Sequence, residues 1–176
     1  MRTNEEPETA GLRTVAELMC VAARTAPKAR GADNIVTAIV EDEGARAVIA
    51  ARMREIGERA GAPFFARDAD CIMAAGTLVV IGTRLRRLGI PGCNLCGWDG
   101  CAESEKHEAR CAYNAGDLGI ALGSAVSVAA DHRVDNRIMY TVGRAVVELG
   151  TLGPEVGIAH GVPLSVRGKN PFFDRK

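Results

Sequence analysis

The segment 89–115 interrupts the hydrophobic patterning of this 176-residue chain and contains four of its six cysteines. Glycine, cysteine, aspartate and glutamate dominate the segment, and the periodic spacing of apolar residues found on either side disappears. We interpret 89–115 as an insertion or specialised loop. A chain of this length can bury a sizeable core, so it needs neither a metal nor disulfides merely to fold.

The cysteines of this segment, Cys93, Cys96, Cys101 and Cys111, have the spacing C-x2-C-x4-C-x9-C. The first two can direct both sulfur atoms to one side of a tight turn, and the neighbouring glycines permit unusual backbone angles. Three closely spaced cysteines followed by a more distant fourth suit an iron–sulfur cluster, whose ligands are typically four thiolates. The pattern predicts that these four residues bind such a cluster.

Two alternatives to the cluster stay open from the residues alone. Structural zinc also accepts four thiolates, but commonly from two separated C-x2-C pairs, and this chain has one such pair. A disulfide or a redox-active thiol pair is the second alternative. Cys20 and Cys71 lie among apolar residues, so we interpret them as small buried hydrophobic side chains. Cys71 could still replace Cys111 as the fourth ligand.

Charge and hydropathy argue against several classes of partner. The 22 basic and 22 acidic residues give a formal net charge of zero, and 4% of residues are aromatic, which disfavours nucleic-acid binding. The most apolar helical stretch, 118–130, lies between Asp117 and Asp131 and is shorter than the ~20 residues of a membrane span. The N-terminus lacks the pattern of a secretory signal. We expect a cytoplasmic protein with no nucleic-acid or membrane partner, in which cysteines serve as ligands or reactive thiols.

Helices and strands alternate along the sequence, which predicts a mixed α and β fold. We expect a mobile tail over 1–11 and a single domain over 12–176, with 89–115 as its cysteine-rich segment. The expected helices cover 12–26, 45–60, 117–130 and 137–149, with a helical turn at 70–75 after an extended stretch that begins at 64–65. The expected strands cover 35–40, 78–82 and 156–166. In the second helix, the expected inward positions are Val48, Ala51, Met53 and Ile56.

Charged and histidine side chains in and near the cysteine segment give weaker signals. Acidic residues near the cysteines either guide a basic redox partner or form a solvated loop face; they are Asp99, Glu103, Glu105 and Glu108. His107 is interpreted as a solvated loop residue. His160, within an apolar strand, is interpreted as a core histidine whose hydrogen bonds are satisfied rather than as a catalytic base.

Several stretches of the sequence resemble one prokaryotic family. They are the run from Cys93 into 117–125, the N-terminal 16–29, the Val-Asp-Asn-Arg motif at 134–137, and 168–175. Together they resemble the ferredoxin-domain-containing proteins of unknown function over residues 12–175. The resemblance implies a [4Fe-4S] cluster on the four cysteines and electron transfer with an unidentified redox partner, but it implies no particular reaction.

A fainter resemblance is to nitroreductase-like flavoproteins. Residues 22–27 are similar to the end of their first helix, 163–169 to their terminal strand, and 117–130 to their central helix. This implies an α+β core, a homodimer and FMN, with Arg24, Lys28 and Lys169 at the flavin phosphate. The chain has Leu-Arg-Thr at 12–14 in place of their N-terminal arginine-serine signature, and the cysteine segment is foreign to most of them.

The resemblances and the residues together give one expectation and two alternatives. The expected fold is a nitroreductase-like α+β core with an inserted iron–sulfur loop, and the expected function is electron transfer. One alternative is an FMN-dependent oxidoreductase fed by the cluster. The other is a zinc-stabilised binding protein without redox chemistry. Arg24 and Lys28 also have a simpler interpretation, as basic residues at the end of a helix, where they favour its dipole.

Overall fold

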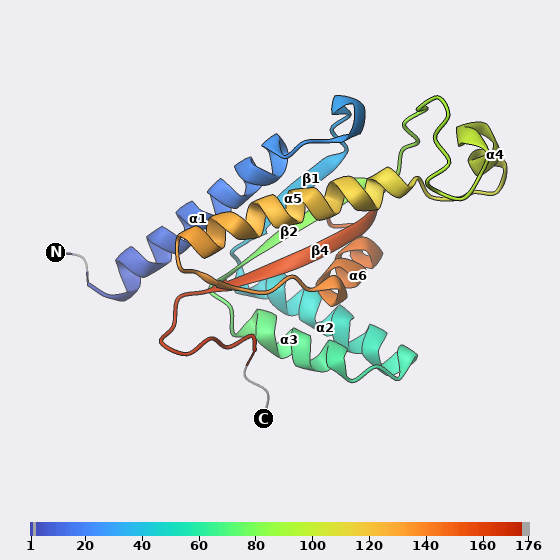
Figure 1. The fold of residues 1–176 in the computed structure, drawn as a ribbon. Helices are drawn as coiled ribbons and strands as arrows, with labels where there is room; N and C mark the ends of the chain where they lie inside the picture. Colours follow the sequence, from blue (N-terminus) through green and yellow to red (C-terminus); the bar gives the residue numbers. More distant parts are fainter. Residues whose placement is uncertain (2, 174–176) are drawn as a thin grey trace.

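A four-stranded antiparallel sheet with the order β1-β2-β4-β3 lies between two layers of helices (Figure 1). The computed structural model describes residue 1 and residues 3–173. The strands are β1 (Ile35–Val40), β2 (Thr77–Arg84), β3 (Asp135–Asn136) and β4 (Val156–Ser165). The helices are α1 (Glu5–Thr25), the 3-10 turn η1 (Ala29–Gly31), α2 (Glu43–Ala60), α3 (Phe64–Met73), α4 (Gly100–Lys106), α5 (Ala112–Asp131) and α6 (Tyr140–Leu149).

The central strand β2 is buried on both of its faces. Val79 and Ile81 pack into a core with α1 and α5, whereas Leu78 and Val80 pack into a second core with α2, α3 and α6. Because helices cover both faces, the strand is a continuous apolar run and not the alternating pattern of a half-exposed sheet. This arrangement confirms the mixed helix and strand fold.

Neither core includes any residue of the range 85–113. Within that range Ser104 is the only buried residue. The segment, including α4, projects beyond the end of the sheet in Figure 1. The two cores of the domain are therefore built without this region.

Local signals predicted several elements well. The strand expected at 35–40 is β1, and both α2 and α6 end at glycines in the left-handed conformation, Gly61 and Gly150. Glycine is favoured there because it has no Cβ to clash in that conformation. The described residues contain no helix long and apolar enough to cross a membrane.

Other expectations are corrected by the structure. Residues 5–11, expected within a mobile tail, form the exposed start of α1, where three glutamates in the first turn favour the helix dipole. Helix α3 replaces the extended stretch and short turn expected at 64–75. Helix α5 starts at Ala112, so it takes in the last residues of the segment 89–115.

The buried stripe of α2 also differs from expectation. Val48 and Ala51 are exposed, and Ile49 and Ala50 are buried instead, together with Met53 and Ile56 as expected. The stripe begins at Arg46, which is buried and whose guanidinium donates a 2.6 Å hydrogen bond to the Glu41 carbonyl. Because a charged residue occupies one of the buried positions, the apolar pattern did not show which face of the helix is buried.

Candidate functional site

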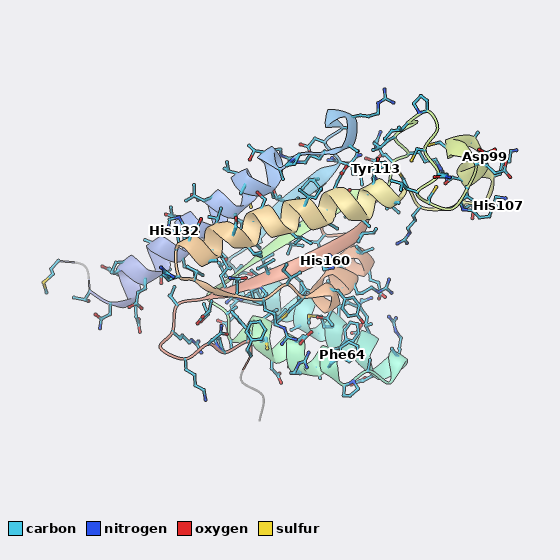
Figure 2. The ribbon with its side chains drawn as sticks, in the orientation of Figure 1. Phe64, Asp99, His107, Tyr113, His132 and His160 are labelled. Atoms are coloured by element: carbon cyan, nitrogen blue, oxygen red, sulfur yellow. The ribbon has the colours of Figure 1, made fainter. Side chains whose placement is uncertain are left out.

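The cysteine segment connects the end of β2 to the start of α5. Figure 2 shows Asp99 and His107 at its outer part and Tyr113 at the first turn of α5. Cys93 and Cys96 lie in the loop, Cys101 lies in α4, and Cys111 is the residue immediately before α5. All four are half-buried and free, with no disulfide among them.

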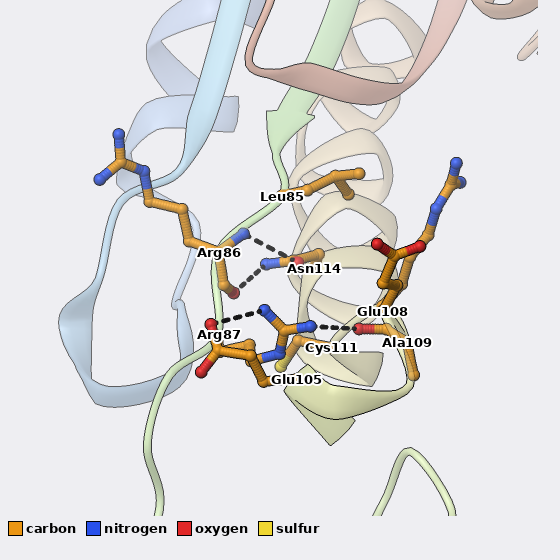
Figure 3. Close-up of a pocket in the computed structure, with 9 residues that line it drawn as sticks. Leu85, Arg86, Arg87, Glu105, Glu108, Ala109, Cys111 and Asn114 are labelled. Carbon is orange, nitrogen blue, oxygen red and sulfur yellow. Dashed lines mark hydrogen bonds and ion pairs between the residues drawn. The ribbon is translucent and has the colours of Figure 1, made fainter. Parts of the chain in front are cut away.

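Two polar side chains anchor the base of the segment (Figure 3). Asn114, buried in the first turn of α5, accepts a hydrogen bond from the Arg86 N–H at 3.2 Å and donates one to the Arg86 carbonyl at 3.0 Å. Arg87 donates to the carbonyls of Ser104 and Ala109, each at 3.2 Å. These bonds hold the two ends of the segment side by side.

Two adjoining clefts lie over this base. One has a volume of about 430 Å³ and is lined by Cys111 (Figure 3); the other has a volume of about 610 Å³ and is lined by Cys101. Arg86, Arg87 and Glu105 line both clefts. The two C-terminal cysteines of the motif therefore flank the same pair of arginines.

The donor chemistry of the segment fits a four-thiolate cluster, because four free and partly exposed sulfur atoms lie in one stretch outside the cores. Their side chains do not converge in the structure. Among the described residues, no group of three or more histidine, cysteine, aspartate or glutamate side chains is placed to hold a metal ion. Binding a cluster therefore requires the loop to close around it.

Two of the four acidic residues of the segment, Glu103 and Glu105, are paired with basic side chains. Glu105 lies 3.5 Å from Arg87, and Glu103 contacts Lys106 at 2.9 Å and His107 at 3.3 Å. The His107 ring stacks on Trp98 with a centroid separation of 3.8 Å. These contacts reduce the net negative charge around Glu103 and Glu105, and the choice between a solvated loop face and guidance of a basic partner stays a prediction.

The two remaining cysteines lie away from the segment. Cys20 is on α1 and packs against the first core, whereas Cys71 is on α3 and packs against the second. Burial raises the pKa of each thiol. Both therefore have the surroundings of structural cysteines, and the assignment of Cys111 as the fourth ligand stays a prediction.

The residues expected at a flavin phosphate do not form one group within the chain. Lys28 is almost fully buried and donates to the carbonyls of Ala23 and Ala26, each at 2.8 Å, and to that of Arg24. Lys169 follows β4 at the far end of the sheet, where β4 pairs with β3. Since β4 has ten residues, the two lysines lie at ends of the sheet separated by about 30 Å.

Arg24 is committed to a partner within the chain. Its guanidinium bonds the carboxylate of Asp33 and, at 2.8 Å, the carbonyl of Ile35. Burial opposes ionisation of Asp33, but hydrogen bonds from Arg24 and from the Ile35 N–H outweigh it and lower the pKa of that carboxyl group. Arg24 thus joins the end of α1 to the start of β1, in line with its interpretation as a helix-end residue.

Sequence reasoning missed Arg87, Ser104 and Asn114 as parts of the site. Their contacts join residues up to 28 positions apart, which no local pattern reveals. One signal was available for Asn114, a polar residue on the inward stripe of α5 next to the last cysteine of the motif.

Solved structures with this fold are nitroreductase-like. A nitroreductase with bound FMN from Desulfitobacterium hafniense superposes with a TM-score of 0.60 at 14% identity, covering 95% of this chain and 82% of its own. A nitroreductase family protein from Clostridium novyi gives 0.59 at 14% identity, covering 94% and 76%. The hypothetical oxidoreductase YcnD from Bacillus subtilis gives 0.56 at 18% identity, covering 90% of this chain, which spans 59% of that protein.

One relative has a higher sequence identity, and one family model matches the C-terminal part of the chain. An uncharacterized protein from Archaeoglobus fulgidus is 40% identical over 173 residues, which cover 94% of this chain and 92% of that protein. Residues 107–175 match the family described as "Uncharacterized protein containing a ferredoxin domain (DUF2148)", a range that includes Cys111. The chain belongs to this family of ferredoxin-domain proteins and has the nitroreductase fold.

Proposed function

We propose that this protein transfers electrons through a [4Fe-4S] cluster held by Cys93, Cys96, Cys101 and Cys111. The observation that carries the proposal is the presence of four free thiols in one segment that neither core requires. Membership of a ferredoxin-domain family supports it. When bound, such a cluster supplies reversible one-electron transfer, with a potential set by hydrogen bonds, charge and burial.

The chain contributes a fixed base and an adaptable loop. Arg87 and Asn114 hold the segment at its two ends, so Cys101 and Cys111 are attached to the rigid domain. Gly97 and Gly100 have φ of 82° and 78°, and neither has a neighbouring atom within 4 Å of an added Cβ. In our proposal the loop with Cys93 and Cys96 moves toward this base.

Arginine side chains offset the negative charge of a four-thiolate site. Arg86 and Arg87 line the clefts of both Cys101 and Cys111, and Arg110 lines the cleft of Cys111. Opposite charges at short range stabilise one another where water is partly excluded. Arg86 and Arg87 also contact Glu155 at 2.7 Å and Glu105 at 3.5 Å, respectively, so we assign these arginines the role of balancing part of the charge that converging sulfur ligands bring to the site.

The proposal is tested by anaerobic purification followed by absorption spectroscopy and measurement of iron, acid-labile sulfide, zinc and flavin. About four irons and four sulfides per chain are expected for a four-thiolate cluster. Cys93→Ala and Cys96→Ala should lose the iron and remain folded, whereas Cys20→Ala and Cys71→Ala serve as matched controls that keep it. Stoichiometric zinc without iron would instead make the segment a structural zinc site.

A second candidate function is an FMN-dependent oxidoreductase that receives electrons from the cluster. Its support is the fold shared with a nitroreductase that has bound FMN. The engagement of Lys28 and Arg24 in contacts within the chain counts against the flavin phosphate site implied by the resemblance. Flavin retained by the anaerobically purified protein would favour this candidate.

The homodimer implied by the same resemblance belongs to this second proposal. The exposed face of α5 carries no charged side chain between Ala112 and Ala130. Its residues are Ala112, Ala115, Gly116, Gly119, Ile120, Gly123, Ser127 and Ala130. Analytical ultracentrifugation should give twice the chain mass if this face joins two copies, and a monomer mass would contradict it.

A further inference from the structure

One edge of β4 has no neighbouring strand over part of its length. Gly161 exchanges two backbone hydrogen bonds with Met139, N–H to carbonyl at 3.0 Å and 2.8 Å, so its polar groups point away from β2. In an antiparallel strand this orientation repeats every second residue. The N–H of Ala159 therefore points to the same side, where no strand of the described chain pairs with it.

A cavity of about 140 Å³ lies between this edge and α6. Its lining is rich in hydrogen-bond donors and includes no aspartate or glutamate. The polar side chains that line it are Arg110, Tyr140, Arg144 and His160. Figure 2 shows His160 on β4.

The positive charge of this cavity is only partly neutralised. Arg110 has no ion-pair partner among the described residues. Arg144 lies 3.3 Å from Glu148, but the same carboxylate also contacts Arg59 at 3.0 Å and Arg52 at 3.7 Å. Arg52 is also paired with Glu55 at 2.9 Å, so Glu148 is shared mainly between Arg144 and Arg59. Because Arg110 is unpaired within the described chain and the lining includes no carboxylate, the cavity keeps an excess of positive charge.

His160 adds an unpartnered polar atom, which corrects the expectation of a histidine with satisfied hydrogen bonds. Its Nδ1 is buried and has no hydrogen-bond partner in the described chain. Buried polar atoms are normally paired, and an exception calls for an explanation such as a ligand. An acceptor within the cavity would supply a partner for the Nδ1–H tautomer of this ring.

We propose that this cavity binds a small oxyanion of phosphate size, held by Arg110, Arg144 and His160. The volume matches a group of a few heavy atoms, being close to that of a cavity that holds benzene. The donors come from three sides of the cavity: Arg144 from α6, Arg110 from the turn before α5, and His160 from β4. A tetrahedral anion can accept hydrogen bonds from all three sides. Guanidinium groups are well suited to phosphate oxygens.

Equilibrium dialysis with radiolabelled inorganic phosphate tests the site, with chloride holding the ionic strength constant. We expect one phosphate per chain, bound about 10-fold more weakly by Arg144→Gln and by Arg110→Gln, as loss of a charge-assisted bond predicts. Both arginines are exposed, so the variants should fold. Arg167→Gln, an exposed arginine beyond β4, is the matched control and should bind as the wild type does.

Competition identifies the source of the anion. Displacement of labelled phosphate by FMN at lower concentrations than by unlabelled phosphate would support the site and identify its ligand as a phosphate monoester. Displacement by acetate at lower concentrations than by phosphate would overturn the assignment to phosphate. The absence of saturable binding, or equal weakening by Arg144→Gln and Arg167→Gln, would overturn the site itself.

The iron content of the same samples separates this proposal from the proposed function. Arg144→Gln should keep its iron while losing phosphate affinity, because Arg144 lies on α6 and outside the cysteine segment. Cys93→Ala should show the reverse. Failure of either proposal can thus be recognised independently of the other.

Discussion

The buried ammonium group of Lys28 caps the C-terminal end of α1. It donates to carbonyls of three residues in or just after the last turn of that helix. Terminal carbonyls of a helix have no partner within it, and a cation at that end also favours the helix dipole. This is the simpler of the two roles that the sequence offered for this lysine.

Replacing this lysine should destabilise the fold. We expect Lys28→Met to lower the free energy of unfolding by about 2–3 kcal/mol, because partly buried carbonyls lose a charged donor. Lys106→Met is the control: Lys106 is an exposed residue with a surface ion pair, so its loss should cost less than ~1 kcal/mol. Urea unfolding measures both, and equal stability of the two variants would show that Lys28 has no capping role.

We expect His160 to make the stability of the protein depend on pH. Burial lowers the pKa of this histidine below its ordinary value of 6.5. The unfolded chain therefore takes up a proton at a higher pH than the folded chain does, and acid favours unfolding. The stabilisation is fully present above about pH 6.5 and is lost as the pH falls toward the folded pKa.

The measurement compares wild type with His160→Gln in phosphate-free buffers between about pH 5 and 8, the range in which histidine changes charge. The unfolding free energy of the wild type should fall more steeply with acid than that of the variant. Arg110, Arg144 and Tyr140 line the same cavity and remain in both proteins. Parallel curves would refute the assignment of this pH dependence to His160.

At the scale of elements, the contact of α6 with β4 depends on a glycine. A Cβ added to Gly143 would lie 1.6 Å from the Ala159 carbonyl oxygen, which is backbone and cannot move aside easily. By contrast, Gly119 on the exposed face of α5 has no atom within 4 Å of an added Cβ. The two positions thus form a matched pair for the same substitution.

We expect Gly143→Ala to destabilise the protein by about 3 kcal/mol or more, since overpacking displaces a helix from the sheet. Gly119→Ala should stabilise it by roughly 0.5–1 kcal/mol, because alanine is the better helix former. Thermal and urea unfolding report both effects. Similar small changes in the two variants would mean that α6 does not approach β4 this closely.

Elements with strong local signals could be predicted, and those that depend on distant contacts could not. The β-branched run at 35–40 and the glycine stops at Gly61 and Gly150 correspond to β1 and the ends of α2 and α6. The two-residue strand β3 exists only through its pairing with the end of β4. No pattern in two residues could indicate it.

In the candidate site, too, local sequence features could be predicted and contacts between distant residues could not. The spacing of the four cysteines pointed to the segment that projects from the fold, and the structure agrees that no core depends on it. The contacts of Arg87 and Asn114 depend on how β2 and α5 are placed, so they emerge only from the three-dimensional fold. The flavin residues were grouped by resemblance, and the sheet places Lys28 and Lys169 at opposite ends.

At the scale of the whole molecule, the chain consists of a three-layer domain and the segment 85–113. We expect this segment to change conformation while the domain stays folded. Both cores are built outside 85–113, so removal of a cluster should leave the domain intact. The loop with Cys93 and Cys96, in contrast, has almost no buried residues to hold it. Local stability is lowest where few apolar contacts are made.

Limited trypsin digestion of iron-loaded and iron-depleted protein tests this division. Depletion should accelerate cleavage after Lys106 and Arg110, both exposed within the segment, by about 10-fold or more, as expected when local opening costs little free energy. Cleavage within α1, α2 and α6 should stay slow in both forms, because the two cores protect these helices. Mass spectrometry of the fragments and circular dichroism of the depleted protein give the result. Loss of helical signal on depletion, with cleavage throughout the chain, would show instead that the cluster holds the whole fold together.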